Sequence, residues 1–173
     1  MRPMWFNYPT GAGVNEIDDQ FQLGSNLIVR PVFEKDAESV KVWLPAGEVW
    51  YYAFSGTGIV GTGARVEVPM TLDTFGLFVR GGSVIPMLRG DKEGVRSSKD
   101  LEGSKVDLSV YLDEEGKAKG FLFLSDGITT KYEQGDYSLF ELEWDGKEIK
   151  YALKHGPDSD FSELIGEIQI FGQ

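Results

Sequence analysis

The sequence contains no cysteine and only one histidine, His155. Without cysteine the chain cannot form a disulfide bond, a catalytic thiolate or a zinc site built from thiolates. A single histidine also makes a paired-histidine metal site, or a catalytic triad that uses histidine, hard to build within one chain. Motifs that bind cofactors are absent as well, so we expect no cofactor and no metal.

Basic residues are few, and long hydrophobic runs are missing. Lysine and arginine number 17 against 28 acidic residues, which gives a formal net charge of −11. Phosphate groups and anionic membrane surfaces are bound by clustered Lys and Arg, and here these residues are scattered. No apolar run approaches the roughly 20 residues that a membrane helix needs. We therefore expect neither nucleic acid nor membrane as a partner.

What the chain does have is apolar and aromatic content in a strand-like pattern. Of its 173 residues 41% are hydrophobic and 13% aromatic, enough for one or two folded domains. Apolar and polar residues alternate over 40–44 and over 106–112, and Gly81-Gly82 and Asp145-Gly146 mark turns. These signals predict an all-β protein made of short strands, typical of β-sandwiches.

One short segment, Ile17–Leu23, carries the only helical signal. Asp18 or Asp19 could cap such a helix, because a side-chain oxygen can accept hydrogen bonds from the free N–H groups of the first turn. A second irregular stretch, residues 89–104, is polar and lacks periodicity. It predicts a linker or long surface loop between two modules.

The opening run, residues 1–32, contains an Arg-Pro-apolar-aromatic segment, then Asp-Asp-Gln-aromatic, a glycine and an apolar strand. Residues 44–51, 68–86 and 120–127 add Leu-Pro…Gly-Glu-Val-Trp-Tyr, Val-Arg-Gly-Gly-Ser-Val-Ile-Pro and Gly-Phe-Leu-Phe-Leu-Ser-Asp-Gly. Together these segments resemble the end of family 31 glycoside hydrolases, the α-glucosidase group. The resemblance covers essentially the whole chain and is weaker after about residue 100.

The resemblance implies an architecture. The fold class is all-β, with tandem antiparallel β-sandwich modules preceded by a remnant of the last strand and exit loop of a (β/α)8 barrel. The expected domains are the barrel end at 1–24, the proximal sandwich at 25–88, the linker or loop at 89–104, and a distal sandwich at 105–173, either complete or truncated. The chain is then the tail of a larger enzyme.

Within the family, the Glu48–Tyr52 and Arg96–Ser98 segments are most similar to the glucosidase II group, which trims glucose from N-linked glycans. Ser125 and Tyr52 depart from the family pattern, which has acidic residues at both positions. The subgroup implies a catalytic barrel upstream, a regulatory β subunit and a glycan substrate as partners. It also implies the lumen of the endoplasmic reticulum as the location.

Retaining glycoside hydrolysis needs two carboxyl groups about 5 Å apart. Asp18 and Asp19 are the best candidates, but adjacent side chains diverge and capping explains at least one of them. No segment resembles the family's nucleophile or acid/base aspartates. We therefore expect no catalytic residue here, and a non-catalytic role in supporting the barrel of an enzyme that is itself a hydrolase.

Trp43, Trp50 and Tyr51 are the remaining candidate site residues. Their rings could contact sugars, or they could pack in the core and between domains, where aromatic residues dominate the energetics. The first role belongs to an alternative function, a free-standing carbohydrate-binding module. A protein-interaction module is a further alternative, and it would show an exposed apolar patch.

Overall fold

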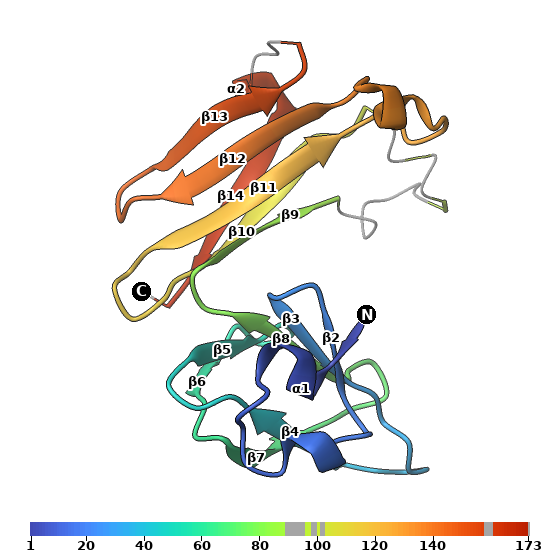
Figure 1. Cartoon of the computed structure of the whole chain (residues 1–173), viewed down its shortest axis with the longest axis vertical. Coiled ribbons are helices and arrows are strands. Elements are labelled where there is room, and N and C mark those ends of the chain that lie inside the picture. The colour runs from blue at the N-terminus through green and yellow to red at the C-terminus, as the bar shows by residue number, and fades with distance from the viewer. Residues whose placement is uncertain (89–95, 98–99, 101–102, 158–160, 173) are drawn as a thin grey trace. The chain divides into compact units, whose positions relative to one another are not determined.

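The computed structural model describes residues 1–88, 96–97, 100, 103–157 and 161–172. They form two compact units, Met1–Gly81 and Gly82–Phe171, in a mostly β fold with a few short helices (Figure 1). The prediction of a β fold is thus confirmed. In the described residues no helix has the length and apolar character to cross a membrane. Most of the expected linker, and part of the Arg96–Ser98 segment, lie outside the described residues.

The first unit contains a six-stranded sheet in the order β1-β2-β3-β8-β5-β6 and a two-stranded sheet, β4-β7. Every strand pair in the two sheets is antiparallel. The elements are β1 (Arg2–Pro3), α1 (Met4–Asn7), the 3-10 helix η1 (Val14–Glu16), β2 (Phe21–Leu23), β3 (Leu27–Arg30), β4 (Ser39–Leu44), β5 (Val49–Tyr52), β6 (Gly58–Val60), β7 (Ala64–Pro69) and β8 (Gly76–Arg80).

One hydrophobic core joins the two sheets of the first unit. It contains Ile28, Trp50 and Phe78 from the large sheet together with Val42 and Val68 from the small one. Neither sheet could bury these side chains alone, so each stabilises the other. The alternation over 40–42 holds as predicted, with Val40 and Val42 buried and Lys41 exposed between them.

The second unit is a single six-stranded sheet in the order β13-β12-β11-β9-β10-β14, curled like half of a barrel (Figure 1). Its core includes Val84, Leu108 and Phe140. The elements are β9 (Ser83–Met87), β10 (Val106–Tyr111), β11 (Ala118–Leu124), the 3-10 helix η3 (Lys131–Gln134), β12 (Ser138–Trp144), β13 (Ile149–His155), α2 (Phe161–Leu164) and β14 (Ile165–Phe171).

The expectation of purely antiparallel pairing is corrected in this unit. β14 runs parallel to β10, and β11 meets β9 in a parallel bridge. Both follow from the strand order. β14 returns from the β13 edge of the sheet to the β10 edge, and β9 lies between β10 and β11 instead of at an edge beside β10 alone. The strand Ser83–Met87, expected in the first module, pairs with β10 and so joins the second unit.

The helix expected over Ile17–Leu23 is wrong. The helical turn lies earlier, at Val14–Glu16, and Phe21–Leu23 is the strand β2, which pairs with both β1 and β3. A helix this short is not stable by itself, whereas strand pairing on two sides satisfies the backbone. The expected opening strand is likewise reduced to Arg2–Pro3, with helix α1 directly after it.

The predicted Asp145-Gly146 turn is confirmed, since it joins the antiparallel strands β12 and β13. Asp145 holds the turn through its carboxylate. Lys150 Nζ lies 2.7 Å from Oδ2, and the backbone amides of Lys147 and Glu148 donate to Oδ1 at 3.0 and 3.1 Å. The ammonium group of Lys150 first, and then these amides, lower the pKa of Asp145 to about 2.

This lowered pKa makes the hairpin sensitive to acid. The carboxylate stabilises the fold above its unfolded pKa of about 3.9, and this contribution is lost as the pH falls through about 2. The Asp145→Asn variant should unfold at a lower urea concentration than the parent chain at pH 7. The difference should shrink towards pH 2. A difference that stays constant over this range would contradict the assignment, and the carboxyl carbon shift of Asp145 in NMR gives its pKa directly.

Gly61 lies where two backbone segments cross. A Cβ atom there would lie 1.8 Å from the backbone oxygen of Pro45, which is too close for any side chain. We predict that Gly61→Ala lowers the free energy of unfolding by about 1–3 kcal/mol, as other overpacked sites do. Urea denaturation measures this loss. The exposed neighbour provides the control, because Thr62→Ala should change stability by less than about 0.5 kcal/mol. Equal effects of the two changes would refute the prediction.

Candidate functional site

The N-terminal segment, residues 1–20, is held to the rest of the first unit by a set of polar contacts that we call the anchor. Its first contact is Tyr8, whose hydroxyl donates to Glu48 Oε2 at 2.8 Å. The other carboxylate oxygen of Glu48 accepts from Arg80 Nη2 at 2.5 Å. Burial first, and then the hydrogen bond to Glu48, raise the pKa of Tyr8. The hydroxyl therefore remains a donor at neutral pH, and the carboxylate of Glu48 links Tyr8 to Arg80 at the end of β8.

The second contact is a pair of buried hydrogen bonds from Gln20 to the backbone of Trp43. Gln20 Nε2 donates to the oxygen of Trp43 at 2.9 Å, and Gln20 Oε1 accepts from its N–H at 2.8 Å. Among the described residues β4 pairs with β7 alone, so no strand provides partners for the backbone groups on its other edge. The side-chain amide of Gln20 has a donor and an acceptor, as a peptide bond does. It therefore makes the two hydrogen bonds to Trp43 that a neighbouring strand would otherwise make.

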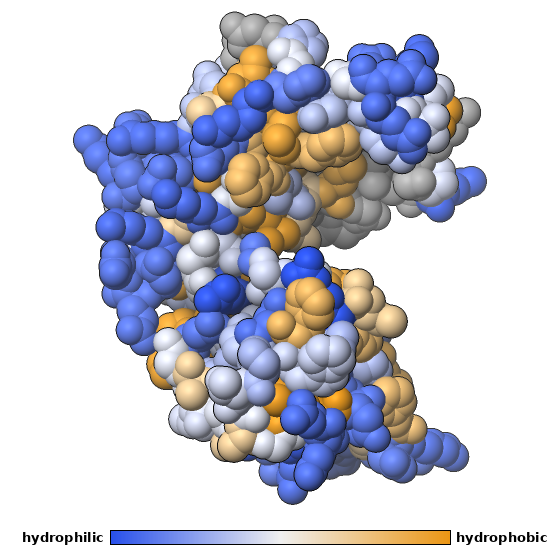
Figure 2. Space-filling view, viewed as in Figure 1, coloured by the Kyte–Doolittle hydropathy of each residue, from blue (hydrophilic) through white to orange (hydrophobic). Residues whose placement is uncertain are grey.

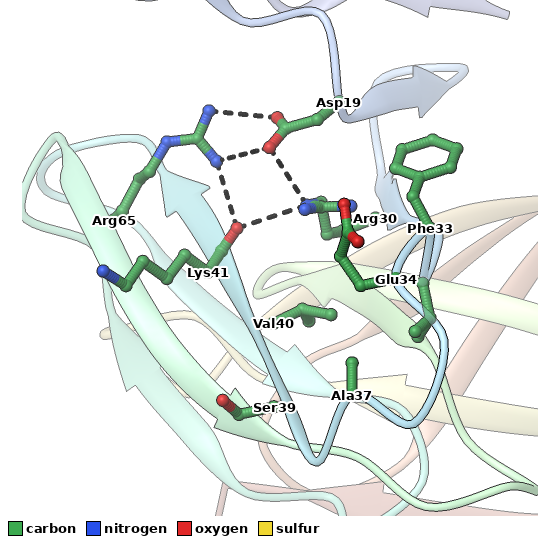
Figure 3. Close-up of a pocket in the computed structure, with 10 residues that line it drawn as sticks. Asp19, Arg30, Phe33, Glu34, Ala37, Ser39, Val40, Lys41 and Arg65 are labelled. Atoms are coloured by element: carbon green, nitrogen blue, oxygen red, sulfur yellow. Dashed lines mark hydrogen bonds and ion pairs between the residues drawn. The ribbon is translucent and has the colours of Figure 1, made fainter.

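The third contact is Asp19, which binds two arginines from different strands. Arg65 Nη1 and Nη2 donate to its two carboxylate oxygens at 2.9 and 3.0 Å, and Arg30 Nε lies 3.2 Å from Oδ2. Both guanidinium groups also donate to the backbone oxygen of Lys41, as Figure 3 shows. Asp19 thus ties the N-terminal segment to β3 of the large sheet and to β4 and β7 of the small one.

A pocket of about 320 Å³ opens beside this ion-pair cluster. Figure 3 shows Asp19, Arg30 and Arg65 at one end of the pocket and Ser39 at the other. Phe33, at one side, is 66% exposed, and the guanidinium carbon of Arg30 lies 5.3 Å from the centre of its ring. The pocket therefore combines paired charges with an accessible aromatic ring.

The three aromatic residues singled out in the sequence are all buried. Trp43 lies edge-on to Tyr8 with 5.9 Å between ring centres, and its indole N–H donates to the oxygen of Gly63 at 2.9 Å. Trp50 is part of the core of the first unit, and Tyr51 follows it in β5. These three rings are therefore packed against other residues, and they do not form an exposed surface on which a sugar could stack.

Asp18 and Asp19 are neighbours in sequence but lie in different environments. Asp18 is exposed, whereas Asp19 is half-buried and occupied by two guanidinium groups. Sequence reasoning missed Gln20, Arg30 and Arg65, which complete this part of the anchor. The available signal was the Asp-Asp-Gln run itself. Among the described residues, no group of three or more acidic or histidine side chains could hold a metal ion.

Apolar side chains are exposed on the N-terminal segment and the strand beside it. Trp5 and Phe6 are 47% and 55% exposed with ring centres 6.5 Å apart, and Met1 and Leu23 are also exposed. Pairing of β1 with β2 places Met1 next to Leu23, because Arg2 is opposite Gln22. We call these four residues the N-terminal apolar patch. Figure 2 shows hydrophobic surface of this kind in the first unit, near the N-terminus marked in Figure 1.

Comparisons with known proteins point to one family. Residues 1–85 match the model described as the glycosyl hydrolase family 31 C-terminal domain. The chain is 39% identical over 134 residues to human neutral alpha-glucosidase AB, covering 77% of this chain and 14% of that protein. It is 33% identical over 158 residues to the alpha-xylosidase of Saccharolobus solfataricus, covering 90% of this chain and 21% of that protein.

Solved structures agree with these matches. The glucosidase II alpha subunit with bound alpha3-Glc2 is similar over 97% of this chain and 18% of its own, with a TM-score of 0.77 and 30% identity. The ER glucosidase II complex of the catalytic subunit with the binding domain of the regulatory subunit gives the same TM-score at 29% identity, over 97% of this chain and 18% of that one. The chain thus spans about a fifth or less of the length of these relatives.

The contact between Gln20 and Trp43 can be tested by truncation. Gln20→Ala removes both hydrogen bonds and leaves the N–H and C=O of Trp43 buried without these partners. We expect a loss of about 2–6 kcal/mol in the free energy of unfolding, from about 1–3 kcal/mol for each of the two unsatisfied groups. Urea denaturation followed by tryptophan fluorescence measures it. The matched control is Gln134→Ala on the exposed turn η3, which should change stability by less than about 0.5 kcal/mol. A Gln20→Ala variant as stable as this control would show that the contact between Gln20 and Trp43 does not stabilise the fold.

Proposed function

Because the chain belongs to the C-terminal region of glycosyl hydrolase family 31, we propose that it is the non-catalytic β portion of a retaining α-glucosidase. In this role it packs against the catalytic barrel upstream of Met1 and steadies the barrel's last segment. The observation that carries the proposal is the N-terminal apolar patch, displayed on a segment that the anchor holds in place. An exposed apolar surface of this kind is typical of a contact with another folded part.

The anchor supports this role by its position. Its residues bind the first 20 residues to strands of both sheets in the first unit. The position of the N-terminal segment is therefore fixed relative to a packed core. The chain covers only a small part of the length of each relative, as expected for one module of a much longer enzyme. We assign the catalytic carboxylates to that missing part, and expect no hydrolysis by this chain alone.

For the architecture we propose the family arrangement. Residues 1–24 form the end of the barrel, residues 25–88 contain the proximal sandwich, residues 89–104 form the connection and residues 105–173 the distal module. The strand Ser83–Met87 is the exception, because it pairs with β10 of the distal module. The two-sheet core of the first unit supports the proximal sandwich. Trp43, Trp50 and Tyr51 serve this module as packing residues, and their burial argues against sugar stacking.

For the parent enzyme we propose cleavage of terminal α-linked glucose, in the trimming of N-linked glycans within the endoplasmic reticulum lumen. A regulatory β subunit is the expected partner besides its own barrel. The support is similarity to the glucosidase II alpha subunit, which was crystallised with the binding domain of its regulatory subunit.

The size of the native polypeptide is the first test. An antibody raised against this chain should detect a band several times larger than 19.2 kDa in extracts of the source organism. Activity towards p-nitrophenyl α-glucoside should be found with that band and not with the purified 173-residue chain. A native band at 19.2 kDa would overturn the proposal.

The patch is tested in the longer protein. Phe6→Asp should lower the yield of soluble, active enzyme about tenfold or more, because a carboxylate buried at an apolar contact costs several kcal/mol. Leu72→Asp changes a fully exposed leucine outside the patch and serves as the matched control. Equal yields for the two variants would show that the patch makes no contact with the barrel.

A further inference from the structure

The pocket beside Asp19 is not used by the proposed function. We propose that it is a binding site for one neutral sugar ring, held between the ion-pair cluster and the ring of Phe33. All of its lining residues lie in the first unit of this chain, so the site does not depend on the catalytic barrel. Its volume of about 320 Å³ lies at the lower end of the range for ligand pockets, which limits the occupant to a single small ring.

The charged groups at this end of the pocket are paired with one another. Both oxygens of Asp19 are engaged by Arg65, and Arg30 also pairs with one of them. The bidentate pair with Arg65 is a strong type of hydrogen bond, which favours a ligand that leaves it in place. An anion would lie close to the carboxylates of Asp19 and Glu34, and a cation close to the two guanidinium groups. A neutral ligand meets neither repulsion.

Hydroxyl groups fit this network without displacing an ion. A hydroxyl donates one hydrogen bond and accepts others, so it can donate to the carboxylate of Asp19 and accept from a guanidinium N–H at the same time. Ser39 and the exposed Glu34 add polar groups elsewhere on the lining. A polyhydroxylated ring therefore matches the polar part of the pocket better than a ligand with a single functional group.

The apolar part of the pocket suits the C–H face of a sugar ring. Phe33 keeps two thirds of its surface exposed although large apolar side chains are normally buried, and Val40 and Ala37 lie on the same lining. The guanidinium group of Arg30 near the ring of Phe33 helps to fix its orientation. The pocket therefore has an aromatic ring for the C–H face of a pyranose and polar groups for its hydroxyl groups.

The test is a titration of the isotope-labelled chain with methyl α-glucoside, followed by amide shifts in NMR. We expect saturable shifts at Phe33, Ser39 and Val40 with a Kd on the order of millimolar, as a ligand of so few atoms allows. A parallel titration with inorganic phosphate should leave these amides unchanged. Saturable shifts with phosphate but not with the sugar would overturn the proposal, and so would the absence of saturable shifts with either.

Variants separate binding from folding. Phe33→Ala should weaken binding of the glucoside at least tenfold while leaving the urea midpoint unchanged, because the ring is largely exposed. Phe121→Ala in the second unit removes a phenylalanine of similar exposure, 58%, and should leave the affinity unchanged. Equal affinities in the two variants would refute the site. Neither readout involves the barrel, so failure here leaves the proposed function standing, and the reverse also holds.

Discussion

The pair of hydrogen bonds between the side chain of Gln20 and the backbone of Trp43 is the contact on which the first unit depends. It fixes the N-terminal segment against the edge of β4, and the segment in turn covers the ring of Trp43. A Cβ on Gly11 would lie 3.0 Å from that ring, so the chain passes Trp43 as closely as a residue without a side chain allows. Tyr8 closes the same face through its edge contact with Trp43. Without this cover, a large aromatic surface would be exposed to water.

Three charged side chains meet where the two sheets of the first unit join. In a chain with a net charge of −11, two of the few arginines are committed to one carboxylate, Asp19. Partly buried pairs of this kind are screened less than surface pairs, and the planar guanidinium of Arg65 meets both carboxylate oxygens. The same geometry that joins β3, β4 and β7 also forms one end of the pocket. A structural connection and a candidate ligand site therefore share their residues.

The aromatic residues show where period-2 reasoning fails. In β5 the run Trp50, Tyr51 and Tyr52 is buried without a break, and so is Val42 to Leu44 in β4. Alternation predicts that every second ring faces water, and this holds only when one face of a strand is open. The pattern still holds in β11, where residues alternate between buried and exposed from Ala118 to Phe123. The sequence could not indicate that a distant segment covers the second face of β4.

The sequence by itself determined the β character of the chain, the turn at Asp145-Gly146 and the family resemblance. These depend on neighbouring residues, because turn chemistry and side-chain alternation act within a few positions. Only the tertiary structure decided that Ser83–Met87 joins the second unit, that β14 pairs in parallel with β10, and that Asp19 binds arginines instead of capping a helix. Asp19 and Arg65 are 46 positions apart. Ion pairs and strand partners at such separations follow from which surfaces can be buried together, and local sequence carries no record of that choice.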